Sequence, residues 1–325
     1  MSENSRVVKA AGVIGAATLL SRILGFIRDA VIAWFFGAGF SSDAFIAAFR
    51  IPNLLRRLFA EGSLSSAFIP VFTQYIVNRG QPEAYRLARS AFRLLSVFLI
   101  LVTLGGILLS PWIVKFVAPG FAADKFSLTV TLTRLMFPYI FFVGLVALCM
   151  GILNVLGHFA VALCMGILNV LGHFAAPALA PVLLNISIIG SVFFISPSLT
   201  EPAVGLAVGV LIGGVLQLAL QLPALMRHGF RFWEKAKLLH PGLKQVGTLI
   251  VPAILGGAVY QINIVIGTIL GSLLAEGSVT YLYFADRLVQ FPLGVFAIAT
   301  ATAVLPSLSR QAAAEDFEAL SDTFV

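Results

Sequence analysis

Long apolar stretches recur along almost the whole chain, and only short polar segments separate them. Eight stretches are long enough to cross a bilayer, for which a helix needs about 20 predominantly apolar residues. They cover about 8–36, 42–60 (with a prolongation over 63–78), 90–118, 126–156, 176–196, 203–226, 246–272 and 279–308. The pattern therefore predicts an all-α polytopic membrane protein with about eight transmembrane helices.

The composition favours the same class and excludes a water-soluble enzyme. Hydrophobic residues make up 59% of the 325 residues and charged residues 11%, whereas soluble proteins average roughly 45–50% and about 25%. Mean hydropathy is +1.01. The two cysteines and four histidines show neither a disulfide framework nor the spacing of metal ligands, so we expect no metal and no cofactor.

Basic residues at the ends of the predicted spans gather on one side of the membrane. That side holds Arg6, Lys9, Arg79, Arg86, Arg89, Arg93, Arg227, Arg231, Lys235, Lys237, Lys244 and Arg310. The opposite side holds only Lys115 and Lys125. Because cytoplasmic loops carry an excess of Lys and Arg, we expect the N-terminus and the basic side to be cytoplasmic. Below, this side is called the inner side and the opposite one the outer side.

Two repeats bear on domain organisation. Residues 146–160 and 161–175 both read VALCMGILNVLGHFA, an exact tandem copy that we expect to bulge into the loop after the fourth span or to lengthen that helix. Residues 43–74 resemble 280–311 more faintly, with Arg50 matching Arg287. Parallel repeats of this kind are a common way to build transporters. We expect a six-helix N-terminal lobe over 1–227, a cytoplasmic basic linker over 228–245, and the first two helices of an incomplete second lobe over 246–325.

Charged residues also lie within or beside the predicted spans, where they are costly. The bases are all arginines, and the set comprises Arg22, Arg28, Arg50, Arg56, Arg57, Arg134 and Arg287 with the acids Asp29, Asp43, Glu61 and Asp286. Such residues normally face a partner or a water-filled cavity. The guanidinium fork suits bidentate binding of phosphate or carboxylate. The excess of bases over acids predicts a cavity that binds an anion.

Spacing places Asp43, Arg50, Arg57 and Glu61 on one face of the second span. This face could line a cavity, or Asp43, Arg50 and Arg57 could form a structural ion-pair ladder. Arg56 and Arg57 could also reach the inner interface by snorkelling, and Arg134 fits a structural or interfacial role. Arg22, Arg28 and Arg287 lie well inside their spans, which favours the cavity.

The motifs LSRILGFIRDAVIAWFFGAG and SDAFIAAFRIPNLLRRLFAEGSLSSAFIPVF resemble the MurJ (MviN) lipid II flippases of the MOP transporter superfamily. The resemblance implies about fourteen helices in two six-helix lobes plus a final pair, around a central cationic cavity. It also implies that Arg22, Arg28, Arg56 and Arg287 bind the substrate and that Asp29 and Asp43 are important acids. Arg50, Arg57, Glu61 and Asp286 remain candidates for cavity or gating ion pairs.

The resemblance implies transport of lipid II, an undecaprenyl-diphosphate-linked disaccharide-peptide, from the cytoplasmic to the periplasmic leaflet of the bacterial inner membrane. We expect alternating access without covalent chemistry, in which Arg22, Arg28 and Arg287 clamp the diphosphate. Expected partners are lipid II and membrane lipids, with cell-wall synthesis proteins as further candidates and no nucleic acid. The chain departs from the family by ending after eight spans, so we expect that it does not transport by itself.

Three alternatives stay open. Another MOP-type exporter, for polysaccharide-lipid or drugs, would share the fold, although a drug exporter should favour acids in its cavity. A membrane enzyme acting on polyprenyl phosphates would need a metal-binding acid pair or an activated nucleophile, and the sequence shows neither motif. A scaffold for cell-wall synthesis would tolerate loss of the central arginines.

Overall fold

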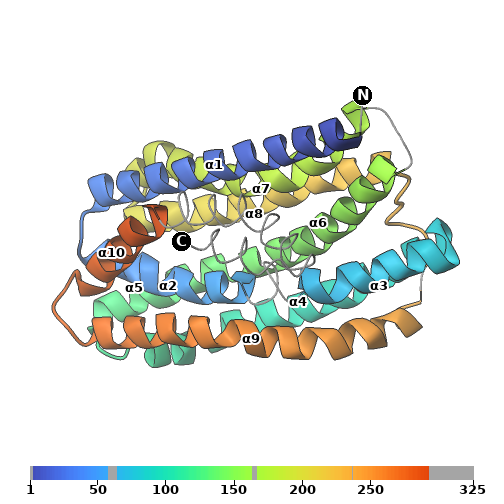
Figure 1. Cartoon of the computed structure of the whole chain (residues 1–325). Helices are drawn as coiled ribbons and strands as arrows, with labels where there is room; N and C mark the ends of the chain where they lie inside the picture. Colours follow the sequence, from blue (N-terminus) through green and yellow to red (C-terminus); the bar gives the residue numbers. More distant parts are fainter. Residues whose placement is uncertain (1–2, 58–63, 163–166, 236, 293–325) are drawn as a thin grey trace, which may run out of the picture. The chain divides into compact units, whose positions relative to one another are not determined.

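The computed structural model describes residues 3–57, 64–162, 167–235 and 237–292 (Figure 1). Within these ranges the chain forms only helices, and the all-α prediction is confirmed. They are α1 (Glu3–Phe36), α2 (Phe40–Arg56), α3 (Leu64–Arg79), α4 (Gln81–Val117), α5 (Ala123–Met136), α6 (Pro138–Ala162), α7 (Ile167–Phe194), the 3-10 helix η2 (Ser196–Ser198), α8 (Pro202–Arg227), α9 (Pro241–Ser272) and α10 (Ser278–Pro292).

Five helical stretches in the described part of the chain are long and apolar enough to cross a membrane. They are Gln81–Val117, Ala123–Leu156, Leu179–Ser198, Pro202–Arg227 and Pro241–Ser272. Each coincides with one of the predicted spans. The first and eighth predicted spans extend into residues whose side chains or placement the structure does not describe.

Two predicted spans each contain two helices. The span expected over 42–60, with its prolongation over 63–78, contains α2, which ends at Arg56, and α3, which begins at Leu64, and residues 58–63 lie outside the described ranges. The span over 126–156 is interrupted between α5 and α6 at Phe137. Phe137 keeps helical backbone angles, and the interruption follows from Pro138, which has no N–H to donate to the preceding turn.

Close packing of α7 against α8 depends on three glycines spaced four residues apart on α8. A Cβ atom on Gly205 would lie 2.9 Å from the backbone of Ser196, and one on Gly209 would lie 3.0 Å from Cα of Ile188. On Gly213 it would lie 3.0 Å from Cα of Leu184. Only hydrogen fits at these positions, so the glycine face packs helices, as its spacing predicts. Helix α1 packs in turn against α7 (Figure 1).

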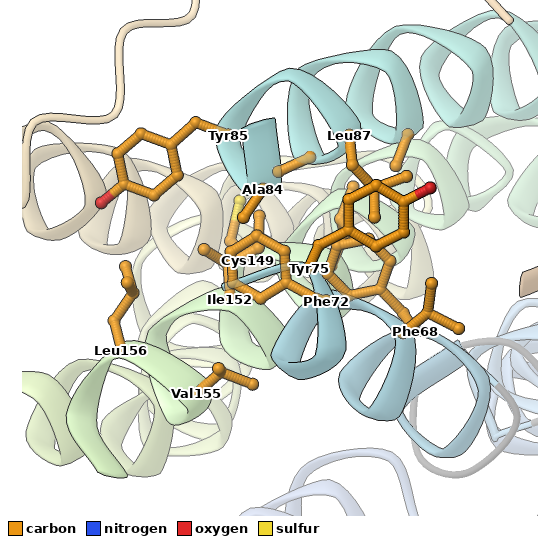
Figure 2. Close-up of a cluster of buried hydrophobic side chains, with 14 of the residues drawn as sticks. Phe68, Phe72, Tyr75, Ala84, Tyr85, Leu87, Cys149, Ile152, Val155 and Leu156 are labelled. Carbon is orange, nitrogen blue, oxygen red and sulfur yellow. The ribbon is translucent and has the colours of Figure 1, made fainter. Parts of the chain in front are cut away.

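A second apolar core fills the space between α3, α4 and α6. Figure 2 shows Phe68, Phe72 and Tyr75 of α3 beside Leu87 of α4 and Ile152 of α6. The same cluster includes Leu225 of α8, Phe230 of the segment after α8, and Val246 of α9. The first turns of α9 therefore share a core with the preceding helices.

The duplicated segment lies at the junction of α6 and α7. Helix α6 continues to Ala162 and α7 already begins at Ile167, so the described parts of both copies are helical and α6 extends beyond its predicted end at 156. The chain forms two compact units, Met1–Thr280 and Tyr281–Val325. The described part of the second unit is residues 281–292, and the expected boundaries at 227 and 246 stay predictions.

Candidate functional site

Arg28 is buried between α1 and α7 and is held by two side chains. Its Nε and Nη2 donate to Oδ1 of Asp29 at 2.9 and 2.7 Å, and its Nη1 donates to Oδ1 of Asn185 at 3.0 Å. Arg28 is 8% exposed and Asp29 5%. Asn185 is fixed by its own donation to the carbonyl of Ser21 at 3.0 Å. Two helices distant in sequence therefore set the orientation of this guanidinium.

At the outer side, Asp43 joins the start of α2 to the start of α10. Its Oδ1 accepts from N and Oγ1 of Thr280 at 3.0 and 2.7 Å, and its Oδ2 accepts from N of Gly277 at 2.8 Å. Asp43 thus binds the first amide groups of α10, where a helix has unpaired N–H donors and positive potential. These bonds hold residues 277–280, at the start of α10, against α2.

Lys125 of α5 completes this arrangement. Its Nζ lies 3.1 Å from Oδ2 of Asp43 and 3.3 Å from Oε2 of Glu276. The rings of Phe40 and Phe121 flank the ammonium at 5.7 and 5.1 Å. Lys125 is buried, so its charge is compensated by two carboxylates and two aromatic faces. We call Asp43, Lys125, Glu276, Gly277 and Thr280 the outer latch.

The charged face predicted on α2 is described in part, and its role stays a prediction. Among the described residues, the ion partner of Asp43 is Lys125 of α5 rather than Arg50 of its own helix. Arg50 and Arg57 are half-buried, and Glu61 lies outside the described residues. Arg56 donates through Nε and Nη2 to Oδ1 of Asn53 at 3.1 and 3.0 Å, one turn earlier on α2.

The other candidate residues lie on α1 and α10. Arg22 is half-buried on α1, six positions before Arg28. In the second unit, the guanidinium of Arg287 lies 5.2 Å above the ring of Tyr283. Gln290 connects the two charged candidates there, because its Oε1 accepts from Arg287 Nη1 at 3.5 Å and its Nε2 donates to Asp286 Oδ2 at 2.6 Å.

At the inner side, His240 fixes the beginning of α9. Its Nδ1 accepts from N of Gly242 at 3.2 Å, so the ring proton resides on Nε2, which lies 3.1 Å from Oε1 of Glu83 on α4. The imidazole also packs edge-on against Tyr75 of α3 at 5.3 Å. We call Tyr75, Glu83, His240 and Gly242 the inner anchor.

Sequence reasoning missed the roles of Lys125, Glu276 and Thr280 in the outer latch. One signal was present, since Lys125 is one of only two basic residues expected on the outer side. Its partners are Asp43, 82 positions away, and Glu276 in the loop after α9. No local pattern joins positions so far apart, so their pairing could be found only in three dimensions.

Solved transporter structures share this fold. An inward-facing multidrug resistance MATE family transporter of the MOP superfamily matches 93% of this chain and 65% of its own, with a TM-score of 0.67 and 17% identity. A MOP superfamily transporter from Pyrococcus furiosus matches 97% and 67%, with a TM-score of 0.62 and 15% identity. The fold is therefore that of MOP superfamily transporters.

Within that class, the family model described as lipid II flippase MurJ matches residues 32–162 and 159–325. The chain belongs to the MurJ family. The two matched segments meet inside the duplicated stretch 146–175, as expected if one copy is additional to the family pattern.

Relatives agree with this assignment. A probable lipid II flippase MurJ from Vibrio cholerae is 41% identical over 317 residues, covering 95% of this chain and 58% of the relative. The lipid II flippase MurJ of Burkholderia cenocepacia is 38% identical over 318 residues, covering 95% and 59%. A structure of lipid II flippase MurJ in an inward closed conformation matches with a TM-score of 0.73 and 26% identity, covering 91% and 58%. This chain thus spans a little under three fifths of these relatives.

Proposed function

We propose that this chain takes part in moving lipid II from the cytoplasmic to the periplasmic leaflet of the bacterial inner membrane, by alternating access and without covalent chemistry. Membership of the MurJ family supports the substrate. The many apolar helices support a multi-pass membrane location, and the basic residues on one side support a cytoplasmic N-terminus.

The arrangement around Arg28 carries the proposal. A buried arginine within a membrane protein is costly and normally belongs to a substrate pathway. Arg28 is held by Asp29 and Asn185 in one orientation, so a bound anion would not have to order the side chain first. A diphosphate offers the acceptor oxygens that guanidinium groups bind best. We assign Arg28 to the diphosphate, together with Arg22, Arg56 and Arg287 as further substrate-binding residues.

The two ends of α9 support an alternating-access mechanism. The inner anchor holds its first turn against α3 and α4. The outer latch holds the loop that follows it against α2 and α5, and the backbone N–H of Gly120 donates to Oγ of Ser272 at 3.3 Å. In this mechanism, release of the inner anchor opens the path to the cytoplasm, and release of the outer latch opens the path to the periplasm.

The remaining charged candidates take supporting roles in this mechanism. Asp29 positions Arg28, and Asp43 gates the outer side. Arg50, Arg57, Glu61 and Asp286 are proposed as cavity or gating ion pairs. Lipid II is the proposed ligand, with membrane lipids around the helices and cell-wall synthesis proteins as candidate partners.

A binding measurement tests the proposal. Native mass spectrometry of the detergent-purified chain with added lipid II should show a bound lipid II molecule. Arg28→Ala should reduce the bound fraction at least tenfold, because it removes the charged hydrogen bonds to phosphate. Asn185→Leu should reduce it less, since the arginine remains but its orientation is no longer fixed.

Arg134→Ala is the matched control, because Arg134 is an exposed arginine on α5, and it should leave binding unchanged. Equal binding of lipid II by the Arg28→Ala variant and the unchanged chain would contradict the assignment of Arg28. A chain that binds undecaprenyl-linked polysaccharide better than lipid II would instead support a different MOP-type exporter.

A further inference from the structure

The segment between α8 and α9 turns sharply back onto the protein as soon as α8 ends. Gly229 has a φ of +78°, a conformation that favours glycine. The amide of Phe230 donates to the carbonyl of Leu225 at 3.2 Å, and that of Gly229 donates to the carbonyl of Met226 at 3.0 Å. These two bonds form a Schellman motif, which directs Phe230 into the core shared with Leu225.

From Phe230 to Trp233, side chains alternate between facing the protein core and facing outward. Phe230 is fully buried, and Phe232 packs against its ring at 4.8 Å and against Phe92 of α4 at 5.1 Å. Arg231 between them and Trp233 after them point outward. Trp233 is 66% exposed and the side chain of Arg231 is 65% exposed, and Lys235 and Lys237 are exposed as well. We call Arg231, Trp233, Lys235 and Lys237 the linker face.

Polar contacts fix this segment along the first turns of α4. Glu234 pairs through Oε2 with Nη1 of Arg89 at 2.7 Å, and its carbonyl accepts from Nη2 of Arg93 at 2.8 Å. Oγ of Ser90 donates to the carbonyl of Lys237 at 2.6 Å. The other oxygen of Glu234 lies 3.9 Å from Arg231. The one acid of the segment is thus paired with buried Arg89, and the linker face keeps a positive charge.

The position of these contacts along α4 sets the depth of the linker face. No charged residue occurs in 94–114, and a helix of that length spans about 31 Å, which matches a hydrocarbon core of about 30 Å. Exposed apolar side chains begin directly after Arg93, with Leu94 at 36% and Val97 at 48% exposure. Arg93 lies at the end of the uncharged stretch of α4, and it bonds to Glu234, the residue after Trp233. This places Trp233 at the level where the hydrocarbon core would meet the headgroups.

We propose that the linker face binds the headgroups of anionic phospholipids in the inner leaflet. Tryptophan prefers the membrane interface, and arginine and lysine beside it extend towards phosphates. Clustered basic residues next to a membrane span are attracted to anionic lipid surfaces. Exposed Leu238 and Leu239 add apolar contacts beside the same surface. This contact would hold the connection between α8 and α9 at a fixed depth.

Fluorescence quenching tests this inference on the intact chain. The protein has three tryptophans, so Trp34→Phe/Trp112→Phe leaves Trp233 as the only reporter. This variant is reconstituted into two kinds of phosphatidylcholine–phosphatidylglycerol vesicle. In one kind phosphatidylcholine carries brominated chains and in the other phosphatidylglycerol does, and the brominated lipid has the same mole fraction in both. Brominated phosphatidylglycerol should quench Trp233 at least twofold more strongly than brominated phosphatidylcholine.

Arg231→Gln/Lys235→Gln/Lys237→Gln should abolish this difference while Trp233 remains quenched, because the indole stays at the interface without its basic neighbours. Lys115→Gln is the matched control: it removes an exposed basic residue at the outer end of α4 and should leave the difference unchanged. Equal quenching by both lipids in the parent would overturn the headgroup preference. Absence of quenching by either lipid would also overturn the proposal, because Trp233 would then lie away from the lipid chains.

Discussion

Lys125 is the buried cation of the outer latch. It lies between Asp43 and Glu276, and both it and Asp43 are buried. We expect Lys125→Met to lower the free energy of unfolding by about 3 kcal/mol, since removing one member of a buried ion pair leaves the other charge uncompensated. Thermal denaturation in detergent should show the loss as a Tm several degrees lower.

Lys115 provides the comparison, because it is the other outer lysine and is exposed. Lys115→Met should leave the Tm within about a degree of the parent, as expected for a surface charge. If the two variants denature alike, Lys125 contributes nothing beyond a surface residue and the latch is held by the amide groups of α10 alone.

At the scale of elements, the glycine face of α8 determines how closely α7 and α8 approach. A Cβ on Gly209 would lie 3.0 Å from the backbone of Ile188, so we expect Gly209→Ala to force the helices apart and to lower the Tm. A Cβ on Gly190 of the facing helix α7 would meet no atom within 4 Å. Gly190→Ala should be neutral or stabilising, because alanine has the higher helix propensity.

A glycine-to-alanine substitution is thus expected to lower the Tm on α8 and to leave it unchanged or raise it on α7. Denaturation of both variants side by side measures this contrast directly. A Gly209→Ala protein as stable as the parent would mean that α7 and α8 can shift without cost.

At the scale of the whole molecule, the inner anchor and the outer latch should work against each other. Val246 is buried at the inner end of α9, so a cysteine there reports opening of that side. In a Cys149→Ala/Cys164→Ala background carrying Val246→Cys, we expect His240→Phe to speed labelling by a membrane-impermeant maleimide several-fold. It removes both the contact with Glu83 and the cap on Gly242.

Lys125→Met in the same background weakens the outer side instead, and should leave labelling at Val246→Cys unchanged or slower. Inside-out vesicles give the reagent access to the inner side for both measurements. Faster labelling in the Lys125→Met protein would contradict reciprocal opening and would indicate general loosening of α9.

The amino-acid sequence was enough to establish the all-α membrane fold, most of the helices and the family. Hydropathy and glycine spacing are local properties, and the bilayer imposes helix length on each segment separately. The pairing of Arg28 with Asp29 does not follow from helical spacing, which places Asp29 on the same face of α1 as Arg22 and directs Arg28 elsewhere.

Which distant groups meet depended on the packing of the helices in three dimensions. Asp43 binds Lys125 and the start of α10, 82 and 237 positions away, instead of pairing along α2 with Arg50. Asn185 reaches Arg28 from α7, and Glu83 reaches His240 from α4. A charge in a low-dielectric interior must find a compensating partner, but the sequence does not say which one, because the choice depends on which helices become neighbours.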